Sequence, residues 1–439
     1  MSQAADRMVE TIEDPAIDHV FIEFADVNGI SRSKQLTADA FLEKWADGFA
    51  MNLVLLAQTP RNHVPEGSGL GAEIGHADGT VHPIPETTMR LPWRENAVRV
   101  LCRFFHEDER LACSPRAVLE SVLSANDFGF DFYAGSELEF YLLEETPDGE
   151  FTPATDDNHE CVSWATEEVA GFYDRIVDWA GDYGIDLTAL HHEHGPGQLE
   201  VLFDYGRPLE QADTTFDFKR LVKQAGRSFD QWPTFMAKPF DDRSGSGYHL
   251  HVSAFDDEKN VFETADAGDA DGTLSERGRH FVGGLMDHAD ALAALGTPSI
   301  NGFKRFEPNS FAPYTASWGY DNRMTAVRVP PGVVRTETRI ASADANPYLV
   351  IAGTIAAGLD GLRRELEPPT PTTGDPTDDR PVLPRSPEVA LRALETDDAM
   401  VDLLGEDVVR VYAASKRREL EAFRNHVTDW ERDQYVKTV

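Results

Sequence analysis

Two stretches in the first quarter of the chain suggest strands. Residues 19–29, HVFIEFADVNG, alternate apolar and polar positions and end on an Asn-Gly pair, and residues 98–105, VRVLCRFF, form a second apolar-rich run. Side chains along a strand alternate between its two faces, and Asn-Gly is a turn signal that commonly follows a strand. We therefore expect a small β-rich N-terminal domain, with loops filling the segment from about residue 30 to about residue 90.

The periodicity changes to that of helices further on. Residues 113–129, CSPRAVLESVLSANDFG, predict an amphipathic helix with Ser114 as its N-cap and Pro115 in its first turn. We place a domain boundary just before it, at about residue 108. The predicted division is an N-terminal domain over 1–108 and a catalytic domain over 109–439. Helices and short strands alternate through the second part, which predicts an α+β fold.

The C-terminal part contains three further landmarks. Residues 346–362 begin with Asn346 as a cap and Pro347 at the first helical position, and the almost wholly apolar run that follows predicts a buried helix. Residues 368–387 are rich in proline and predict a surface loop. Residues 415–435 return to helix-like amphipathicity.

Charge and composition narrow the class of protein. The formal net charge is −37, from 77 acidic and 40 basic residues, and it is spread along the chain. Such a surface repels nucleic acid, so we expect either a cationic substrate or, more in keeping with the scarcity of lysine, adaptation to high salt. No run of about 18 apolar residues occurs, and no signal peptide begins the chain, so we expect a soluble cytoplasmic protein without a membrane partner. The three cysteines have no spacing typical of a disulfide framework or a zinc ribbon.

The candidate chemistry lies in three stretches that place polar residues at every second position. They are residues 135–144, 245–253 and 335–340. Their alternating polar members are Glu137 and Glu139; His249, His251 and Ser253; and Arg335, Glu337 and Arg339. A strand turns such residues to one face. For any single pair the wet face of an antiparallel sheet is the favoured interpretation, but three together favour a site.

A fourth stretch adds two more carboxylates. In residues 191–200, HHEHGPGQLE, Glu193 and Glu200 flank a Gly-Pro-Gly turn that can fold them toward a common point. Five glutamates and one histidine with little sulfur suit Mg²⁺ or Mn²⁺ better than zinc or copper. Since clustered glutamates repel one another unless a cation neutralises them, we expect a divalent metal site.

Arginines accompany these carboxylates. Five of them follow in the sequence, namely Arg305, Arg323, Arg328, Arg335 and Arg339. Arginine binds phosphate and carboxylate oxygens in bidentate fashion, so metals and arginines together indicate phosphoryl transfer from a nucleotide. Neither the P-loop nor the protein-kinase motifs occur in the chain.

Taken in order, these motifs resemble the glutamine synthetase family over almost the whole chain. The matching segments are GSELEFYL (135–142), HHE (191–193), GPGQLE (195–200), KPFDDRSGSGYHLHVS (238–253), NGFKRF (301–306), WGYDNRMTAVRVP (318–330), RTETRI (335–340) and ADANPYL (343–349). The resemblance implies a small N-terminal β-grasp domain and a large catalytic domain with an antiparallel half-barrel sheet flanked by helices. It also implies a dodecamer of two hexameric rings with active sites between neighbouring subunits.

The resemblance further implies residue roles. Two metal sites are implied, one held by Glu139, Glu193 and Glu200 and the other by Glu137, His249 and Glu337. Substrate glutamate is implied at Gly245, His249, Arg305 and Arg339. ATP contacts are implied at Tyr205, His251, Ser253, Arg328 and Arg335. Arg323 resembles the arginine that steadies the transferring phosphoryl group, and Arg305 and Arg339 complete the implied catalytic set.

The departures from the family pattern concern the amine. Phe311, in the loop PNSFAP (308–313), stands where ammonia-using members carry a glutamate, and FAMN (49–52) stands where they carry an aspartate supplied to the neighbouring subunit. Ser244 replaces an asparagine that often contacts glutamate, and no tyrosine lies between Tyr348 and Tyr412 to accept an adenylyl group. A phenylalanine removes charge and can attract an alkylammonium group by about 0.5–2 kcal/mol. The alternative is that Phe311 only packs its loop closed.

These observations predict an ATP-dependent ligase that joins the γ-carboxylate of glutamate to an amine through γ-glutamyl phosphate. A polyamine such as putrescine is favoured over ethanolamine or methylamine, with ATP as co-substrate and two or more Mg²⁺ or Mn²⁺ ions per site. One alternative is an authentic glutamine synthetase that uses ammonia. Another is a family member without catalysis that serves as a regulatory or structural assembly, against which the complete set of metal ligands and arginines argues.

Overall fold

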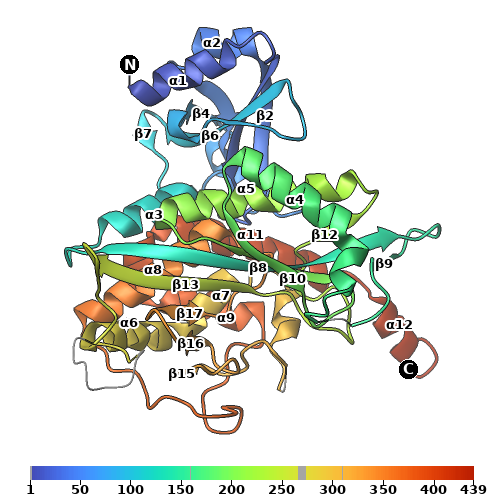
Figure 1. The fold of residues 1–439 in the computed structure, drawn as a ribbon, viewed down its shortest axis with the longest axis vertical. Coiled ribbons are helices and arrows are strands. Elements are labelled where there is room, and N and C mark those ends of the chain that lie inside the picture. The colour runs from blue at the N-terminus through green and yellow to red at the C-terminus, as the bar shows by residue number, and fades with distance from the viewer. Residues whose placement is uncertain (1, 159, 265–272, 309) are drawn as a thin grey trace.

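The computed structural model describes residues 2–158, 160–264, 273–308 and 310–439. Figure 1 shows a smaller N-terminal part, drawn in blue at the top, above a larger part that holds the remaining chain. Each part is built on its own sheet, one with strands between residues 19 and 110 and the other with strands between residues 131 and 338. The division near residue 108 stays a prediction.

The N-terminal sheet combines both strands that the sequence predicted. Its order is β2 (Ser31–Thr37), β1 (His19–Ala25), β6 (Ala97–His106), β4 (Asp78–Pro83) and β3 (Phe49–Asn52), and β5 (Met89–Arg90) and β7 (Glu109–Arg110) also pair with β6. β1 runs parallel to β6 and antiparallel to β2. Helices α1 (Gln3–Ile12) and α2 (Ala38–Lys44) complete this part.

The prediction of loops from about residue 30 to residue 90 is wrong, because β2, α2, β3 and β4 lie there. β2 reads SRSKQLT and none of its residues is buried, so this edge strand lacks the apolar alternation by which strands are recognised. β3 has only four residues, too few for a periodic pattern.

The larger sheet carries the predicted polar faces. Its order is β10 (Leu187–His192), β11 (Gln198–Phe203), β8 (Asp131–Glu145), β13 (Tyr248–Asp256), β17 (Thr336–Thr338), β16 (Val327–Val329) and β15 (Trp318–Tyr320). Short strands β9 (Phe151–Pro153), β12 (Trp232–Thr234) and β14 (Lys259–Asn260) pair at its margins. All neighbours on the main path are antiparallel except β15 and β16. The sheet curls into a half-barrel, so the predicted α+β fold class is confirmed.

Helices cover the sheet and surround one central helix. They are α3 (Pro115–Ser124), α4 (Ala170–Tyr183), α5 (Pro208–Arg227), α6 (Glu276–Asp287), α7 (Ala289–Gly296), α8 (Pro347–Arg363), α9 (Pro387–Thr396), α10 (Asp398–Leu404), α11 (Glu406–Arg424) and α12 (Asp429–Tyr435). Residues 347–362 of α8 are all buried, and the Asn346 side chain accepts a hydrogen bond of 3.0 Å from the Tyr348 amide, which confirms the predicted capped and buried helix. Ser114 occupies the N-cap position of α3, although its side chain makes no capping bond.

The turn after β1 joins the two parts of the molecule. The Asn346 side chain donates to the Asp26 carbonyl at 2.9 Å, and Gly29, in the predicted Asn-Gly turn, has a φ of 73°. A Cβ at Gly29 would lie 2.9 Å from the Asn346 Cα, so glycine is needed here for close approach as well as for conformation.

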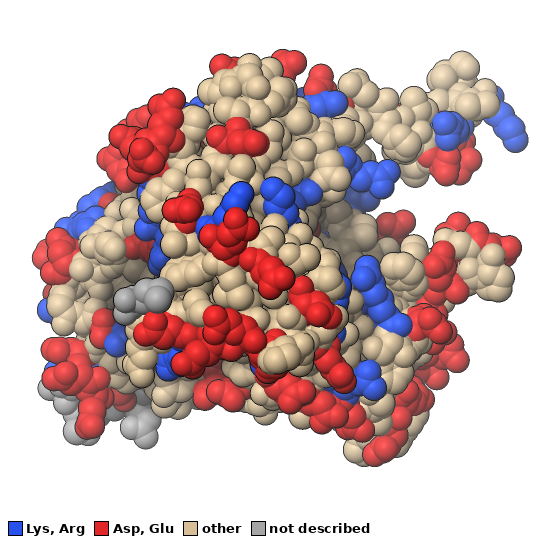
Figure 2. All heavy atoms as spheres, turned by 90° about the horizontal axis from the view of Figure 1, so that it is seen from above, with Lys and Arg blue, Asp and Glu red and all other residues tan. Residues whose placement is uncertain are grey.

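No helix in the described part of the chain is long and apolar enough to cross a membrane. Figure 2 shows one face of the molecule, on which red acidic side chains are more widespread than blue basic ones.

Candidate active site

β8 lies at the centre of the site, between β11 and β13. Its partners bring the predicted polar faces into register, because Glu139 lies opposite Glu200 of β11 and Glu137 lies opposite His249 of β13. The apolar residues between them, such as Leu138, point into the core and are fully buried. Directly opposed side chains in a sheet have Cβ atoms about 4.5–5.5 Å apart, so strand pairing alone gathers these groups.

His249 lies in the middle of the carboxylates. Its Nδ1 is 3.1 Å from a Glu137 oxygen, and its Nε2 is 3.6 Å from a Glu139 oxygen. Nδ1 also lies 3.8 Å from Glu200 and 4.0 Å from Glu337. The hydrogen bond with Glu137 and the charges of the other carboxylates raise the pKa of His249, although burial and the Arg339 charge oppose them.

Glu337 is held by arginines on the other side of His249. Its carboxylate is 2.8 Å from an Nη1 of Arg328 and 2.5 Å from an Nη1 of Arg339, and it is 1% exposed. Burial acts to raise the pKa of this carboxyl, but the charges of Arg339 and the two neighbouring histidines lower it to about 2. Glu337 is therefore ionised throughout the neutral range.

The carboxylates on the β10–β11 side are poorly neutralised. Burial and the charges of Glu139 and Glu200 raise the pKa of Glu193 to about 8. Burial, which outweighs the His249 charge, raises the pKa of Glu139 as well. His191 lies 2.7 Å from Glu200, and this hydrogen bond raises the pKa of the histidine to about 9. The protein itself thus supplies too little positive charge for this group of acids.

Such a donor set fits divalent cations. Among the described residues, three groups in this region offer ligand atoms within 4.8 Å of one another: Glu137, His251 and Glu337; Glu137, Glu200 and His249; and His191, Glu193 and Glu200. Carboxylate oxygens with a few imidazoles suit Mg²⁺ or Mn²⁺, and mutual repulsion among the acids favours a bound cation. Five of the six predicted ligands belong to these groups, and Glu139 lies beside them through His249.

The first of two cavities beside this cluster is the inner cavity, of about 510 Å³, whose lining includes Gly245, His249, Arg305, Phe311 and Arg339. It contains all four positions predicted for glutamate. Arg305 Nε and Arg339 Nε are buried and have no hydrogen-bond partner in the structure. Since buried donors are nearly always paired, these two arginines fit an anionic ligand such as a carboxylate.

The second is the aromatic cavity, of about 360 Å³, whose lining includes Tyr133, Tyr205, His251, Ser253 and Arg335. Four of the five positions predicted for ATP therefore lie around one space. Tyr205 is 66% exposed, with its ring centroid 6.1 Å from that of Tyr133. The Arg335 Nε donates to His251 Nδ1 at 3.1 Å, which links the cavity to the carboxylate cluster.

Phe311 lines the inner cavity and is 66% exposed. Its ring centroid lies 5.1 Å from that of His194, with the planes tilted by 58°. Its carbonyl oxygen is 3.5 Å from an Nη2 of Arg339, so the backbone of the loop reaches the cluster while the ring faces open space.

Two predicted residues lie apart from the cavities. Arg323 is exposed in the segment between β15 and β16 and is not among the described residues that line either cavity. Arg328 contacts Glu337 and Asp321 and is not among the described residues that line the inner or the aromatic cavity.

Sequence reasoning missed several residues of the site. Gln198 donates to Glu139 at 3.0 Å and to the Gly245 carbonyl at 3.1 Å, and so ties one carboxylate to the glycine segment. His191 was within reach of the same reasoning, because it precedes Glu193 at strand spacing. No role was predicted for four charged side chains that line the inner cavity, although three of them lie in the matching segment 238–253; they are Asp241, Asp242, Arg243 and Glu307.

The chain is similar in sequence and structure to several known proteins. A family model described as the glutamine synthetase catalytic domain matches residues 112–435. A glutamine synthetase of Halobacterium salinarum is 33% identical, over 98% of this chain and 96% of its own length. A glutamate–isopropylamine ligase of Pseudomonas sp is 32% identical, over 99% of this chain and 98% of its own length. A solved structure named "Apo GmaS without ligand" has a TM-score of 0.85 at 29% identity, over 98% of this chain and 99% of that one.

The half-barrel sheet and its cluster of carboxylates and arginines are thus those of a ligase. The chain belongs to the glutamine synthetase family, whose members act on glutamate, ATP and an amine or ammonia and generally use divalent metals.

Proposed function

We propose that this protein is a glutamate–amine ligase that uses ATP to form a γ-glutamyl amide with an organic amine. The observation that carries the proposal is the exposed Phe311 ring in the lining of the inner cavity, beside the two arginines that have unpaired buried nitrogens. An aromatic face of this kind contributes apolar surface and a cation-π contact to an alkylammonium group, whereas ammonium offers no carbon to pack.

The remaining residues support the two halves of the reaction. The Arg305 and Arg339 guanidinium groups would hold the glutamate carboxylates, and the aromatic cavity would take the nucleotide between Tyr205 and Arg335. The metal ligands are proposed to be Glu139, Glu193 and Glu200 for one ion and Glu137, His249 and Glu337 for the other, with His191 near the first. Bound Mg²⁺ or Mn²⁺ would neutralise the charge that develops on the transferring phosphoryl group.

A diamine is our preferred substrate within this class. Three exposed carboxylates line the same cavity as Phe311; they are Asp241, Asp242 and Glu307. One ammonium group of a diamine such as putrescine could face these carboxylates while the other amine reaches the acyl phosphate. A monoamine such as isopropylamine, the substrate named for the Pseudomonas relative, would use the aromatic face alone.

An amine panel tests the proposal. Phosphate release is recorded with ATP, Mg²⁺ and glutamate at fixed KCl, with ammonium, isopropylamine or putrescine as the varied substrate. We expect the highest kcat/KM with putrescine. If kcat/KM is higher with isopropylamine than with putrescine, the protein is a glutamate–amine ligase but a diamine is not its preferred substrate. If kcat/KM is highest with ammonium, the proposal of an organic amine as substrate is wrong.

An ammonia-using glutamine synthetase is the second candidate, because two relatives with that name are 33% and 32% identical over nearly the whole chain. The same amine panel distinguishes the two candidate functions, since only the glutamine synthetase is expected to have ammonium as its best substrate.

A further inference from the structure

A third cavity, of about 450 Å³, lies between the two parts of the molecule. We call it the interdomain cavity. Its walls come from the turn after β1, from helix α5 and from helix α11, and they include Asn28, Phe216 and Lys416. None of its lining residues belongs to the lining of the inner or the aromatic cavity, among the residues that the structure describes.

The charge of this cavity is opposite to that of the protein. Its cationic lining residues are Lys219, Arg220, Lys223, Arg227 and Lys416, and its anionic ones are Asp344 and Glu419. In the whole chain, 77 acids face 40 bases. A cavity with five cations and two anions therefore reverses the ratio of the sequence and forms a local positive potential.

Three of the five cations already have oxygen partners. Arg220 pairs with Glu23, Lys219 donates to the Ala345 carbonyl at 2.6 Å, and Lys416 lies 2.5 Å from the Asn28 side-chain oxygen. Lys223 and Arg227 are exposed side chains of α5, and in the described part of the chain neither has a carboxylate within 4.0 Å. Two positive charges thus face the cavity without an ionic partner.

One lysine of this cavity, Lys219, has a lowered pKa. Burial, with a smaller contribution from the Lys223 charge, lowers the pKa of Lys219 to about 7 although Asp344 opposes it. An anion in the cavity would oppose this shift.

The cavity also has an apolar wall. Phe216, Phe235 and Met236 line it, and Met236 is 44% exposed. The ammonium groups of Lys219 and Lys223 lie 5.6 Å and 5.9 Å from the centroid of the Phe235 ring. Phe216 and Phe235 are 3% and 5% exposed, so a ligand in this position would meet positive charge beside the exposed Met236 side chain.

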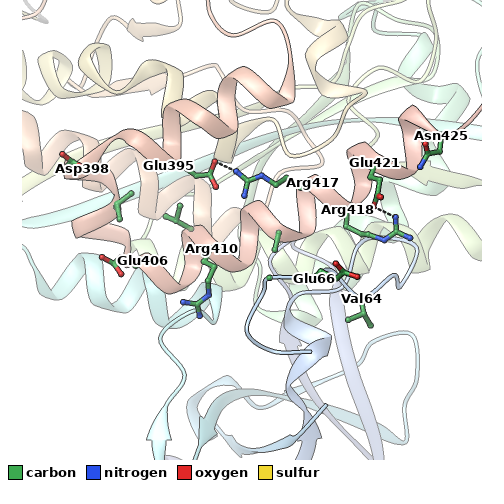
Figure 3. Close-up of a pocket in the computed structure, with 14 residues that line it drawn as sticks. Val64, Glu66, Glu395, Asp398, Glu406, Arg410, Arg417, Arg418, Glu421 and Asn425 are labelled. Atoms are coloured by element: carbon green, nitrogen blue, oxygen red, sulfur yellow. Dashed lines mark hydrogen bonds and ion pairs between the residues drawn. The ribbon is translucent and has the colours of Figure 1, made fainter. Parts of the chain in front are cut away.

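A cavity larger than these three has no such unpaired cations among its described lining residues. It measures about 1160 Å³ and lies between residues 64–67 and helix α11, as Figure 3 shows. Its arginines are paired in place, Arg417 with Glu395 at 2.5 Å and Arg418 with Glu421 at 3.0 Å (Figure 3). These ion pairs leave little charge for a ligand, so size alone does not identify a binding site.

We propose that the interdomain cavity binds a small organic anion, one that carries a phosphate or carboxylate group next to an apolar group. Lys223 and Arg227 bind the anionic group, and Met236 packs the apolar part. The site is separate from the catalytic cluster and does not depend on which amine the enzyme uses.

Calorimetric titration of the full-length protein tests the proposal, with phenyl phosphate, benzoate and inorganic phosphate as probes. A saturating non-hydrolysable ATP analogue, Mg²⁺ and glutamate occupy the catalytic cavities in every titration. We expect saturable binding of phenyl phosphate or benzoate, and weaker binding of inorganic phosphate because it lacks the apolar part. Tighter binding of phenyl phosphate than of benzoate identifies phosphate as the anionic group, and the reverse order identifies carboxylate.

Variants assign the binding to this cavity. Lys223→Ala with Arg227→Ala should weaken binding by roughly tenfold or more, because it removes both cations that bind the anionic group. The control is Arg7→Ala with Lys44→Ala, which removes the same charge from exposed positions of α1 and α2. Lys223→Gln, which keeps most of the side-chain length, gives a second and milder test should the double variant not fold. Equal affinity in the cavity variants and the control, or no saturable binding to the wild-type protein, would overturn the proposal.

Discussion

The Phe311 ring contacts the His194 ring, with the two ring centroids 5.1 Å apart. Phe311 is 66% exposed and lines the inner cavity. The exposed ring is available to a ligand in the cavity, as the proposed role in amine selection requires, and His194 holds it in place.

Replacing Phe311 with glutamate should change amine preference. The carboxylate restores a negative charge in the cavity and removes the aromatic face, so kcat/KM for ammonium should rise relative to putrescine by roughly tenfold, equivalent to about 1.4 kcal/mol and within the range of a cation-π contact. Steady-state kinetics with both amines measures the ratio. Phe423→Glu, at an exposed position of α11, is the matched control. An unchanged ratio would show that the loop residue only packs.

Replacing Glu193 with glutamine should stabilise the metal-free protein. The pKa of Glu193 is raised to about 8 by burial and by Glu139 and Glu200, so its ionisation disfavours the folded state. For a carboxyl with a raised pKa, the stabilising contribution is complete below its ordinary pKa and is lost as the pH rises through about 8. At pH 9 in EDTA, Glu193→Gln should therefore melt higher than wild type by roughly 2 °C.

The same variant should respond less to metal. Adding Mn²⁺ raises the melting temperature of any protein that binds it in the folded state, and a lost ligand weakens that effect. Differential scanning fluorimetry with and without Mn²⁺ measures both changes, with Glu168→Gln at an exposed position as the control. A Mn²⁺-induced shift as large as in wild type would remove Glu193 from the metal site.

Replacing Gly245 with alanine should weaken glutamate binding while the fold persists. A Cβ at this position would lie 2.5 Å from the Arg305 Cγ and 2.8 Å from the Ala237 carbonyl oxygen, so both Arg305 and the backbone at Ala237 must shift. Displacement of one charged hydrogen-bond donor predicts a KM for glutamate that is roughly tenfold higher. Gly181→Ala is the control, because a Cβ there meets nothing within 4 Å and alanine favours the α4 helix. Equal KM values in both variants would contradict the assignment of Arg305 to glutamate.

Stability should fall as the pH rises above neutrality because of His288. This histidine, 3% exposed, lies 2.6 Å from Asp397 and 2.8 Å from Asp360, and Arg364 bonds to Asp287 and Asp360 beside it. Burial opposes the charged form, but hydrogen bonds with Asp397 and Asp360 raise the pKa of His288 above its ordinary value of 6.5. A raised histidine pKa gives stability that is complete below 6.5 and is lost as the pH rises through the folded-state pKa.

Urea unfolding between pH 6 and pH 9 checks this expectation. His288→Gln should lower the free energy of unfolding at pH 6 by about 2 kcal/mol, because it leaves the half-buried Asp397 without its cation and Asp360 with Arg364 alone, and it should flatten the pH dependence. His426→Gln, at an exposed position, should keep the wild-type profile. Parallel pH profiles in the wild type and His288→Gln would show that the pair is not ionised.

Strand periodicity was enough to predict the polar faces of the site. Glu137 and Glu139, and His249 and His251, do share faces of β8 and β13, because side chains alternate in a strand whatever its partners are. The same rule could not find β2, an exposed edge strand without apolar positions. It also could not find Gln198 as a partner of Glu139, since a lone glutamine carries no pattern.

The sequence by itself determined the family, the fold class and the residue types of the site, because local periodicity and motif order are properties of the chain. Only the tertiary structure decided which groups meet. The pairing of β8 with β11 and β13 places Glu139 against Glu200 and Glu137 against His249. The docking of the N-terminal turn on α5 and α11 collects cations that are scattered in an acidic sequence. Charge interaction depends on distance in space, and that distance is set by strand register and packing between elements far apart in the chain.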